Sequence, residues 1–113
     1  MSNEPLPPAP TPVTPQWNPD QIFSMLAEPA RRAVLRSLAP SKPKAATDLR
    51  GATRLRLDAT LKHLSAMRAA GLLVTAPDPS DGRRMLYALA PSVPVVKSPT
   101  GVVIDFGCCV LRL

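Results

Sequence analysis

Cationic side chains are the residues whose types and spacing can do chemistry in this sequence. The segment 50–84 holds seven Lys or Arg residues against three Asp, and the whole chain carries a formal net charge of +6 at pH 7. A basic stretch in the middle of a 113-residue chain favours an anionic partner, most simply nucleic acid. The alternative is an ordinary solvated surface, and charge alone does not separate the two.

No catalytic constellation accompanies these cations. The sequence has one His, scattered carboxylates and no glycine-rich phosphate loop, so nothing assembles a nucleophile, a base and an orienting partner. We therefore expect no enzyme and no cofactor. The N-terminus carries no secretory signal, and no apolar run approaches the roughly 18 residues of a membrane span. We expect a soluble, cytoplasmic protein that does not bind membranes.

Two adjacent cysteines, Cys108 and Cys109, form neither a disulfide framework nor a metal-ligand spacing, so we expect no metal site. Free cysteines are among the most buried residue types, which favours two small buried side chains. The alternative is a redox-active thiol sensor. On a strand the two sulfurs would point to opposite faces, where each could meet a symmetry mate, whereas a disulfide between neighbours would be strained.

The segment 57–75 has the pattern of a helix followed at once by a strand. Leu57, Leu61, Leu64 and Met67 recur at steps of four, three and three, which predicts one buried apolar stripe on a helix. Gly71 is typical of a helix end, and residues 72–75 predict a strand. This order is typical of the recognition helix of a winged helix-turn-helix entering its wing.

The preceding residues predict the rest of a helix-turn-helix. Residues 18–21, Asn-Pro-Asp-Gln, predict a helix start, and Pro29 a second helix over 30–38 that the prolines at 40 and 43 break. A short helix over 45–51, closing near Gly51, and a tight turn lead into the longer helix. After it, the turn-rich segment 77–82 and the alternating segment 83–89 predict a wing hairpin.

Three parts of the chain follow from these patterns. Residues 1–17 are a proline-rich arm, expected to be disordered or, alternatively, to dock on a partner. Residues 18–91 are an α+β winged helix-turn-helix domain. Residues 92–113 predict an added C-terminal β-hairpin of segments 93–97 and 102–113, apolar on both faces near its end. We expect this hairpin to be covered, either between subunits as a dimerisation element or under its own domain.

Three motifs resemble known bacterial regulators. Residues 22–38, IFSMLAEPARRAVLRSL, resemble the opening of arsenic-repressor (ArsR-type) winged-helix regulators, and residues 60–73, TLKHLSAMRAAGLL, resemble their recognition helix and strand entry. Residues 78–89, DPSDGRRMLYAL, resemble the wing of the multiple-antibiotic-resistance (MarR-type) regulators. The resemblance implies a DNA-binding transcriptional regulator, usually a dimer and more often a repressor.

The sequence departs from that family in two places. The arsenic-repressor metal site is a Cys-x-Cys on the helix before the recognition helix, and the matching segment 47–52 has no Cys or His. Those families also usually dimerise through a terminal helix, whereas this chain is predicted to end in strands.

A recognition helix presents its N-terminal, solvent-facing residues to the base edges of double-stranded DNA. By position these are Arg56, Asp58, Ala59, Thr60, Lys62 and His63. Because phosphate and sugar take half to two-thirds of such contacts, we favour phosphate over base edges for Arg54, Arg56 and Lys62. Asp58 has the alternative of pairing with Lys62, and His63 that of a half-buried residue bonded to nearby backbone.

In the wing, Arg83 or Arg84 would enter a narrow minor groove, with Asp81 orienting an arginine through a charge-assisted bond. The alternative for these three residues is a well-formed turn with solvated charges. The alternative for the whole chain is a winged helix that binds proteins through the proline-rich arm or the terminal strand and has no role on DNA.

Overall fold

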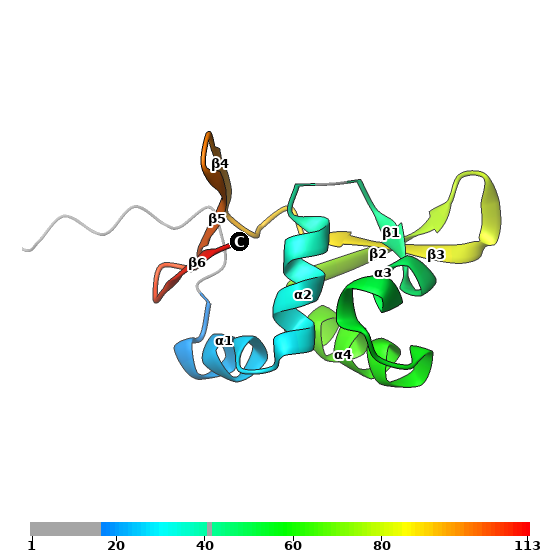
Figure 1. Cartoon of the computed structure of the whole chain (residues 1–113), viewed down its shortest axis with the longest axis horizontal. Helices are drawn as coiled ribbons and strands as arrows, with labels where there is room; N and C mark the ends of the chain where they lie inside the picture. Colours follow the sequence, from blue (N-terminus) through cyan, green and yellow to red (C-terminus); the bar gives the residue numbers. More distant parts are fainter. Residues whose placement is uncertain (1–16, 41) are drawn as a thin grey trace, which may run out of the picture.

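The fold has two small sheets on opposite sides of a helical layer. The structure is a computed structural model that describes residues 17–40 and 42–113, so the arm predicted for residues 1–17 lies outside the described residues except for Trp17. Figure 1 shows one sheet on each side of α2, and the α+β class is confirmed. The elements are α1 (Pro19–Leu26), α2 (Pro29–Leu38), β1 (Lys44–Ala45), α3 (Ala46–Thr53), α4 (Leu57–Ala69), β2 (Leu73–Asp78), β3 (Asp81–Leu89), β4 (Val95–Ser98), β5 (Gly101–Asp105) and β6 (Val110–Arg112).

The predicted helix signals are confirmed at the start of α1 and at the end of α4. The side chain of Asn18 accepts a hydrogen bond from the backbone N–H of Gln21 at 3.1 Å. Gly71 follows α4 with φ of +84°, its N–H donates to the Arg68 carbonyl, and the N–H of Leu72 donates to the Met67 carbonyl. These two bonds are the paired bonds of a Schellman motif, which ends the helix and turns the chain into β2.

The helix α3 ends later than the sequence predicted. It continues through Gly51 to Thr53, and the left-handed residue that caps it is Arg54, with φ of 59°. The observed end at Thr53 thus lies just beyond the predicted end near Gly51-Ala52. Gly51 is exposed within a helical turn, where a glycine weakens the helix without breaking it.

The wing is a three-stranded antiparallel sheet in the order β1-β3-β2. The strands β2 and β3 form the predicted hairpin, and the short β1 pairs Lys44 with Tyr87 and Ala45 with Leu86. The register shifts between Pro77 and Asp78, next to the turn. This sheet joins the wing directly to the segment that begins α3.

The C-terminal extension is a three-stranded meander, β4-β5-β6, rather than the predicted hairpin with one long arm. A tight turn breaks that arm: the Asp105 carboxylate accepts the N–H of Gly107 at 2.9 Å, and the N–H of Phe106 donates to the Cys109 carbonyl at 2.9 Å. Gly107 adopts φ of +84°. In one uninterrupted strand Ile104 and Leu111 would point to opposite faces. Because the turn interrupts the strand, Leu111 pairs with Ile104 and lies on the same face of the sheet.

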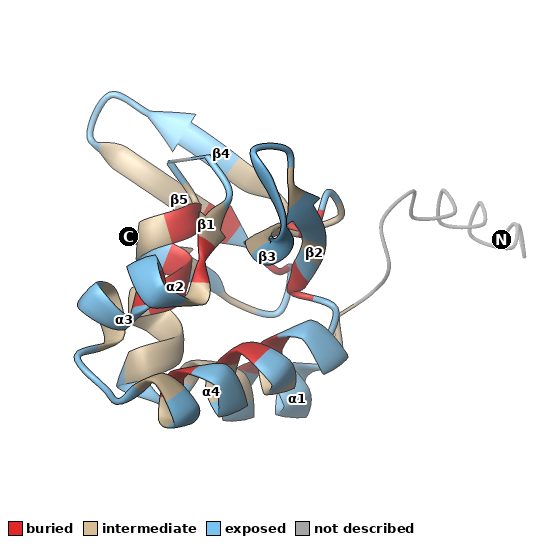
Figure 2. Ribbon diagram, turned by 90° about the vertical axis from the view of Figure 1, so that its right-hand side faces the viewer, coloured by how far each residue is buried: buried red, intermediate tan, exposed pale blue. Residues whose placement is uncertain are grey.

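One hydrophobic core joins all these parts. Ile104 and Phe106 of the C-terminal segment are buried against residues from the helices, so one face of this sheet packs under its own domain. Trp17 packs edge-on against Phe106, with 5.7 Å between the ring centroids, and thus belongs with the folded part. Figure 2 shows the buried residues on the inward sides of the helices and strands. The core also includes Ile22, Val34, Leu35, Leu38, Leu49, Leu64, Met67, Leu72 and Leu73.

Because Ile104 is buried in this core, Ile104→Ala is expected to lower the free energy of unfolding by about 2–5 kcal/mol through the cavity that it leaves. Thermal and urea unfolding followed by circular dichroism measure the change. The matched control is Val96→Ala in the adjacent strand, where the side chain is 55% exposed and the change stays within about 0.5 kcal/mol. A change as small as that of Val96→Ala for Ile104→Ala would show that the sheet contributes nothing to the domain core.

Candidate nucleic-acid interface

The buried stripe of α4 differs from the predicted one. Thr60, Leu64 and Met67 are fully buried, whereas Leu61 is 38% exposed and Leu57 is half-buried. Thr60 therefore cannot contact a partner, and its expected place at base edges is wrong. Asp58, Lys62 and Ser65 lie on the exposed side of the helix, as expected for a face that meets a ligand. We call Asp58, Lys62 and Ser65 the outer ridge of α4.

The buried Thr60 hydroxyl explains this rotation of the helix. The hydroxyls of Thr60 and Thr53 lie 2.9 Å apart, and Thr53 also donates to the Arg50 carbonyl and accepts from the N–H of Leu55. The Thr60 hydroxyl is therefore the donor in the bond between them. This network lies inside the turn of the helix-turn-helix and fixes α4 relative to α3. No role for Thr53 was predicted from the sequence, because a threonine at the C-terminal end of a helix is not a strong structural signal.

The start of α4 is dominated by exposed charge. Arg54 and Arg56 are exposed, and Arg56 Nε lies 3.9 Å from Asp58 Oδ1 with side chains 91% and 75% exposed. An ion pair this long and this exposed contributes little to stability. Asp58 therefore pairs with Arg56 instead of the expected Lys62, and this weak pairing leaves both side chains available to a partner.

His63 lies on the opposite flank of α4, toward α2. Its Nδ1 accepts a hydrogen bond from Arg31 Nε at 3.1 Å, which requires a neutral imidazole with its proton on Nε2. His63 is half-buried, as its alternative interpretation had it, but its partner is a side chain rather than backbone. With Nδ1 bonded to Arg31, Nε2 is the ring nitrogen that could donate to a phosphate. No local pattern predicts this contact, because it joins residues 32 positions apart.

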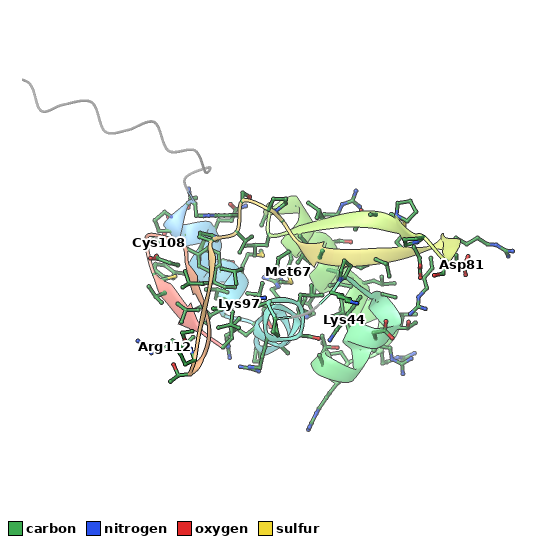
Figure 3. The ribbon with its side chains drawn as sticks, turned by 90° about the horizontal axis from the view of Figure 1, so that it is seen from above. Lys44, Met67, Asp81, Lys97, Cys108 and Arg112 are labelled. Atoms are coloured by element: carbon green, nitrogen blue, oxygen red, sulfur yellow. The ribbon has the colours of Figure 1, made fainter. Side chains whose placement is uncertain are left out.

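The wing arginines are exposed but differ in their contacts. Arg84 Nη2 lies 3.0 Å from Asp48 Oδ2, and the same oxygen accepts the backbone N–H of Ala45 at 3.2 Å at the start of α3. Asp81 Oδ1 accepts the backbone N–H of Arg83 at 3.1 Å, so its expected bond to an arginine side chain is wrong. Asp81 shapes the turn at the tip of the wing (Figure 3). Asp48, which sequence reasoning missed, ties the wing to α3.

A groove runs between α4 and the wing, with a volume of about 390 Å³. Its apolar lining comes from Leu57 and Leu61 of α4 and from Met85 and Tyr87 of β3, and Arg84 lies at its edge. A second hollow of about 560 Å³ shares Leu57 and Leu61 and is bordered by Arg50, Arg56 and Asp58. The outer ridge of α4 and the wing thus flank an apolar strip bordered by arginines.

Positive charge is concentrated on this part of the surface. All seven Lys and Arg side chains between residues 50 and 84 belong to exposed residues: Arg50, Arg54, Arg56, Lys62, Arg68, Arg83 and Arg84. Exposed cations beside a protruding helix provide the electrostatic attraction that a polyanion requires.

Cys108 and Cys109 lie in the turn between β5 and β6, and Figure 3 places Cys108 at the opposite end of the molecule from Asp81. Cys108 is exposed and Cys109 is half-buried, so the expectation of two buried side chains is wrong for Cys108. Burial, the bond to the Cys108 thiol and the nearby charge of Asp105 raise the pKa of Cys109. A raised pKa lowers the thiolate fraction, which disfavours a reactive redox thiol.

Comparisons with known proteins define the fold. No protein-family model and no curated protein matches the sequence. A solution structure from Mycobacterium bovis, a homodimeric winged helix-turn-helix DNA-binding domain and possible ArsR-family regulator, is similar with a TM-score of 0.54 and 24% identity. The match covers 63% of this chain and 62% of that one, so this chain spans less than two thirds of its length.

Two further solved structures share more of the sequence. A crystal structure of an ArsR family transcriptional regulator is 30% identical, with a TM-score of 0.54, over 62% of this chain and 72% of that one. The cadmium metal sensor CMTR from Mycobacterium tuberculosis is 30% identical, with a TM-score of 0.51, over 65% and 72%. Within residues 17–40 and 42–113, no three His, Cys, Asp or Glu residues are grouped to hold a metal ion, so we carry no metal over from that sensor.

The helix-turn-helix with its β-hairpin defines this chain as a winged helix-turn-helix protein. Together with the 30% identity over 72% of the crystal structure, it shows that the chain belongs to the ArsR family of transcriptional regulators. The described helices include none long and apolar enough to cross a membrane.

The left-handed conformation of Arg54 costs about 1–2 kcal/mol for a residue with a Cβ. Arg54→Gly therefore raises stability by about 1 kcal/mol and Tm by about 4–8 °C, as thermal unfolding measures. The matched control, Arg50→Gly inside α3, lowers stability by about 1 kcal/mol. A fall in Tm for Arg54→Gly would mean that the arginine side chain stabilises the turn by more than the backbone strain costs.

Proposed function

We propose that this protein binds double-stranded DNA sequence-specifically as a homodimeric transcriptional repressor. The observation that carries the proposal is the outer ridge of α4, which is exposed, bordered by Arg54 and Arg56, and fixed by the hydrogen bond between Thr53 and the buried Thr60. A rigid, exposed helix beside cations fits the major groove, which is about 12 Å wide and admits one α-helix.

Each element has a role in the proposed complex. Lys62, Arg54 and Arg56 bind phosphates and set the register, while Asp58 and Ala59 face base edges. Arg83 reaches the minor groove from the wing, where a narrow groove concentrates negative potential. Arg84 reaches DNA by exchanging Asp48 for a phosphate.

The homodimer is supported by the Mycobacterium bovis domain, which is described as homodimeric and DNA-binding. Two copies would place two recognition helices in successive major grooves about 34 Å apart. The similar structures are regulators, which supports a binding protein over an enzyme and the cytoplasm as its location.

A salt series on random-sequence duplex DNA tests the proposal, with binding followed by fluorescence anisotropy. If about five phosphates are neutralised, log K falls with log salt at a slope of about −4.5. Lys62→Ala weakens binding to all sequences about equally and reduces the slope by about one, because it removes one phosphate contact. The matched control is Lys97→Ala, an exposed lysine on β4 of the other sheet, which leaves the slope unchanged.

Weak binding without a salt slope would reject the DNA proposal and turn the search to protein partners. The combined neutralisation of Arg56, Lys62 and Arg83 separates the two functions. It abolishes measurable DNA binding at physiological salt if the proposal is right, whereas a protein-binding module tolerates it.

A further inference from the structure

Leu61 is an apolar side chain on the charged face of α4, and the fold places it there by burying a threonine instead. A single exposed leucine is ordinary. Here, however, Leu61 at 38% exposure shares its groove with Met85 at 44% and with the half-buried Leu57 and Tyr87. Together with Ala45, Ala46 and Thr47 at the start of α3, these side chains line a mostly apolar groove between the recognition helix and the wing.

The charges around this strip identify its occupant. Arg84 lies at the edge of the groove, and Arg50 and Arg56 border the adjoining hollow that Leu61 also lines. An apolar strip between cations fits a ligand with an apolar group on an anionic scaffold. The C5-methyl of thymine is the apolar group on a base edge in the major groove of DNA.

We propose that Leu61 reads thymine methyl groups in the major groove, so that the preferred DNA site carries thymine on the side of α4 nearest the wing. The inference rests on the proposed DNA binding and adds a specificity determinant to it. Leu61 lies three residues after Asp58 and four before Ser65, on the same side of α4. It would therefore enter the major groove of DNA together with the outer ridge. A helix of about 10–12 Å diameter fills a groove about 12 Å wide, and its flanks therefore meet the base edges along the walls.

The methyl contact predicts that the protein distinguishes thymine from cytosine and from uracil, although these bases carry no difference in charge. Cytosine lacks the methyl group and presents an N4 amino group in the major groove, which an apolar side chain cannot satisfy. Deoxyuridine keeps every hydrogen-bonding group of thymidine and lacks only the methyl. Loss of one buried methyl is expected to weaken binding about fourfold.

The test is a double-mutant cycle that combines the substitution Leu61→Ala in the protein with the replacement of thymidine by deoxyuridine in the DNA. The preferred duplex is first selected from random sequences with the wild-type chain, and each thymidine in it is then replaced singly by deoxyuridine. With the wild-type chain, replacement at one or two positions in a half-site weakens binding about fourfold, measured by anisotropy. With Leu61→Ala the same replacements change the affinity less than 1.5-fold, because the methyl has lost its partner.

Two controls separate the contact from fold and charge. Val96→Ala on the C-terminal sheet, also an exposed apolar residue, retains the full deoxyuridine effect. Leu61→Ala keeps the salt slope of the wild-type chain, since leucine neutralises no phosphate. Thermal unfolding confirms that Leu61→Ala is folded under the conditions of the binding assay.

Other outcomes overturn the inference in distinguishable ways. An equal deoxyuridine effect in wild type and Leu61→Ala would assign the methyl contact to another residue. Salt-dependent binding with a selected site but no deoxyuridine effect would overturn the thymine inference and leave the DNA proposal standing. Salt-dependent binding with no selected site would overturn both the thymine inference and the proposed sequence specificity, and would leave non-specific DNA binding. Binding without a salt slope would overturn both. If Leu61→Ala altered self-association and not thymine discrimination, the groove would be an interface between copies of this chain.

Discussion

The hydrogen bond between the half-buried Thr53 and the fully buried Thr60 is the interaction on which the helix-turn-helix depends. It joins the last residue of α3 to the first turn of α4 across the left-handed Arg54. Because a buried hydroxyl without a partner costs about 1–3 kcal/mol, the fully buried Thr60 requires Thr53, which also bonds the Arg50 carbonyl and the Leu55 N–H. The bond therefore sets which side of α4 faces the core and which side faces a partner.

The wing is positioned by a contact of a different kind. Asp48 Oδ2 accepts hydrogen bonds from both Ala45 and Arg84, so one carboxylate joins the beginning of α3 to strand β3. The pair is about half exposed, and pairs of this kind contribute about 1 kcal/mol or less. The contact orients the wing but adds little to the stability of the fold. In the proposed complex Arg84 could therefore exchange Asp48 for a phosphate without unfolding its surroundings.

The sequence predicted the elements wherever a local backbone requirement selects a residue type. Asn18 and Gly71 each satisfy such a requirement, and both ends were predicted correctly. The end of α3 was predicted only approximately, near Gly51-Ala52 instead of Thr53, because a glycine can lie inside a helix as well as end one. The turn after Phe106 had a local signal in Asp105 and Gly107, but the alternating apolar residues of segment 102–113 outweighed it in the prediction.

The candidate site was predictable in its charges but not in its orientation. Periodicity assigned Leu61 to the core and Thr60 to the surface because burial of leucine is the stronger prior. The structure reverses the two, since Thr53 supplies the partner that makes a buried threonine acceptable. The reversal places a leucine among arginines. Solubility alone gains nothing from that arrangement, whereas in the proposed complex with DNA the leucine would contact a thymine methyl while the neighbouring arginines bind phosphates.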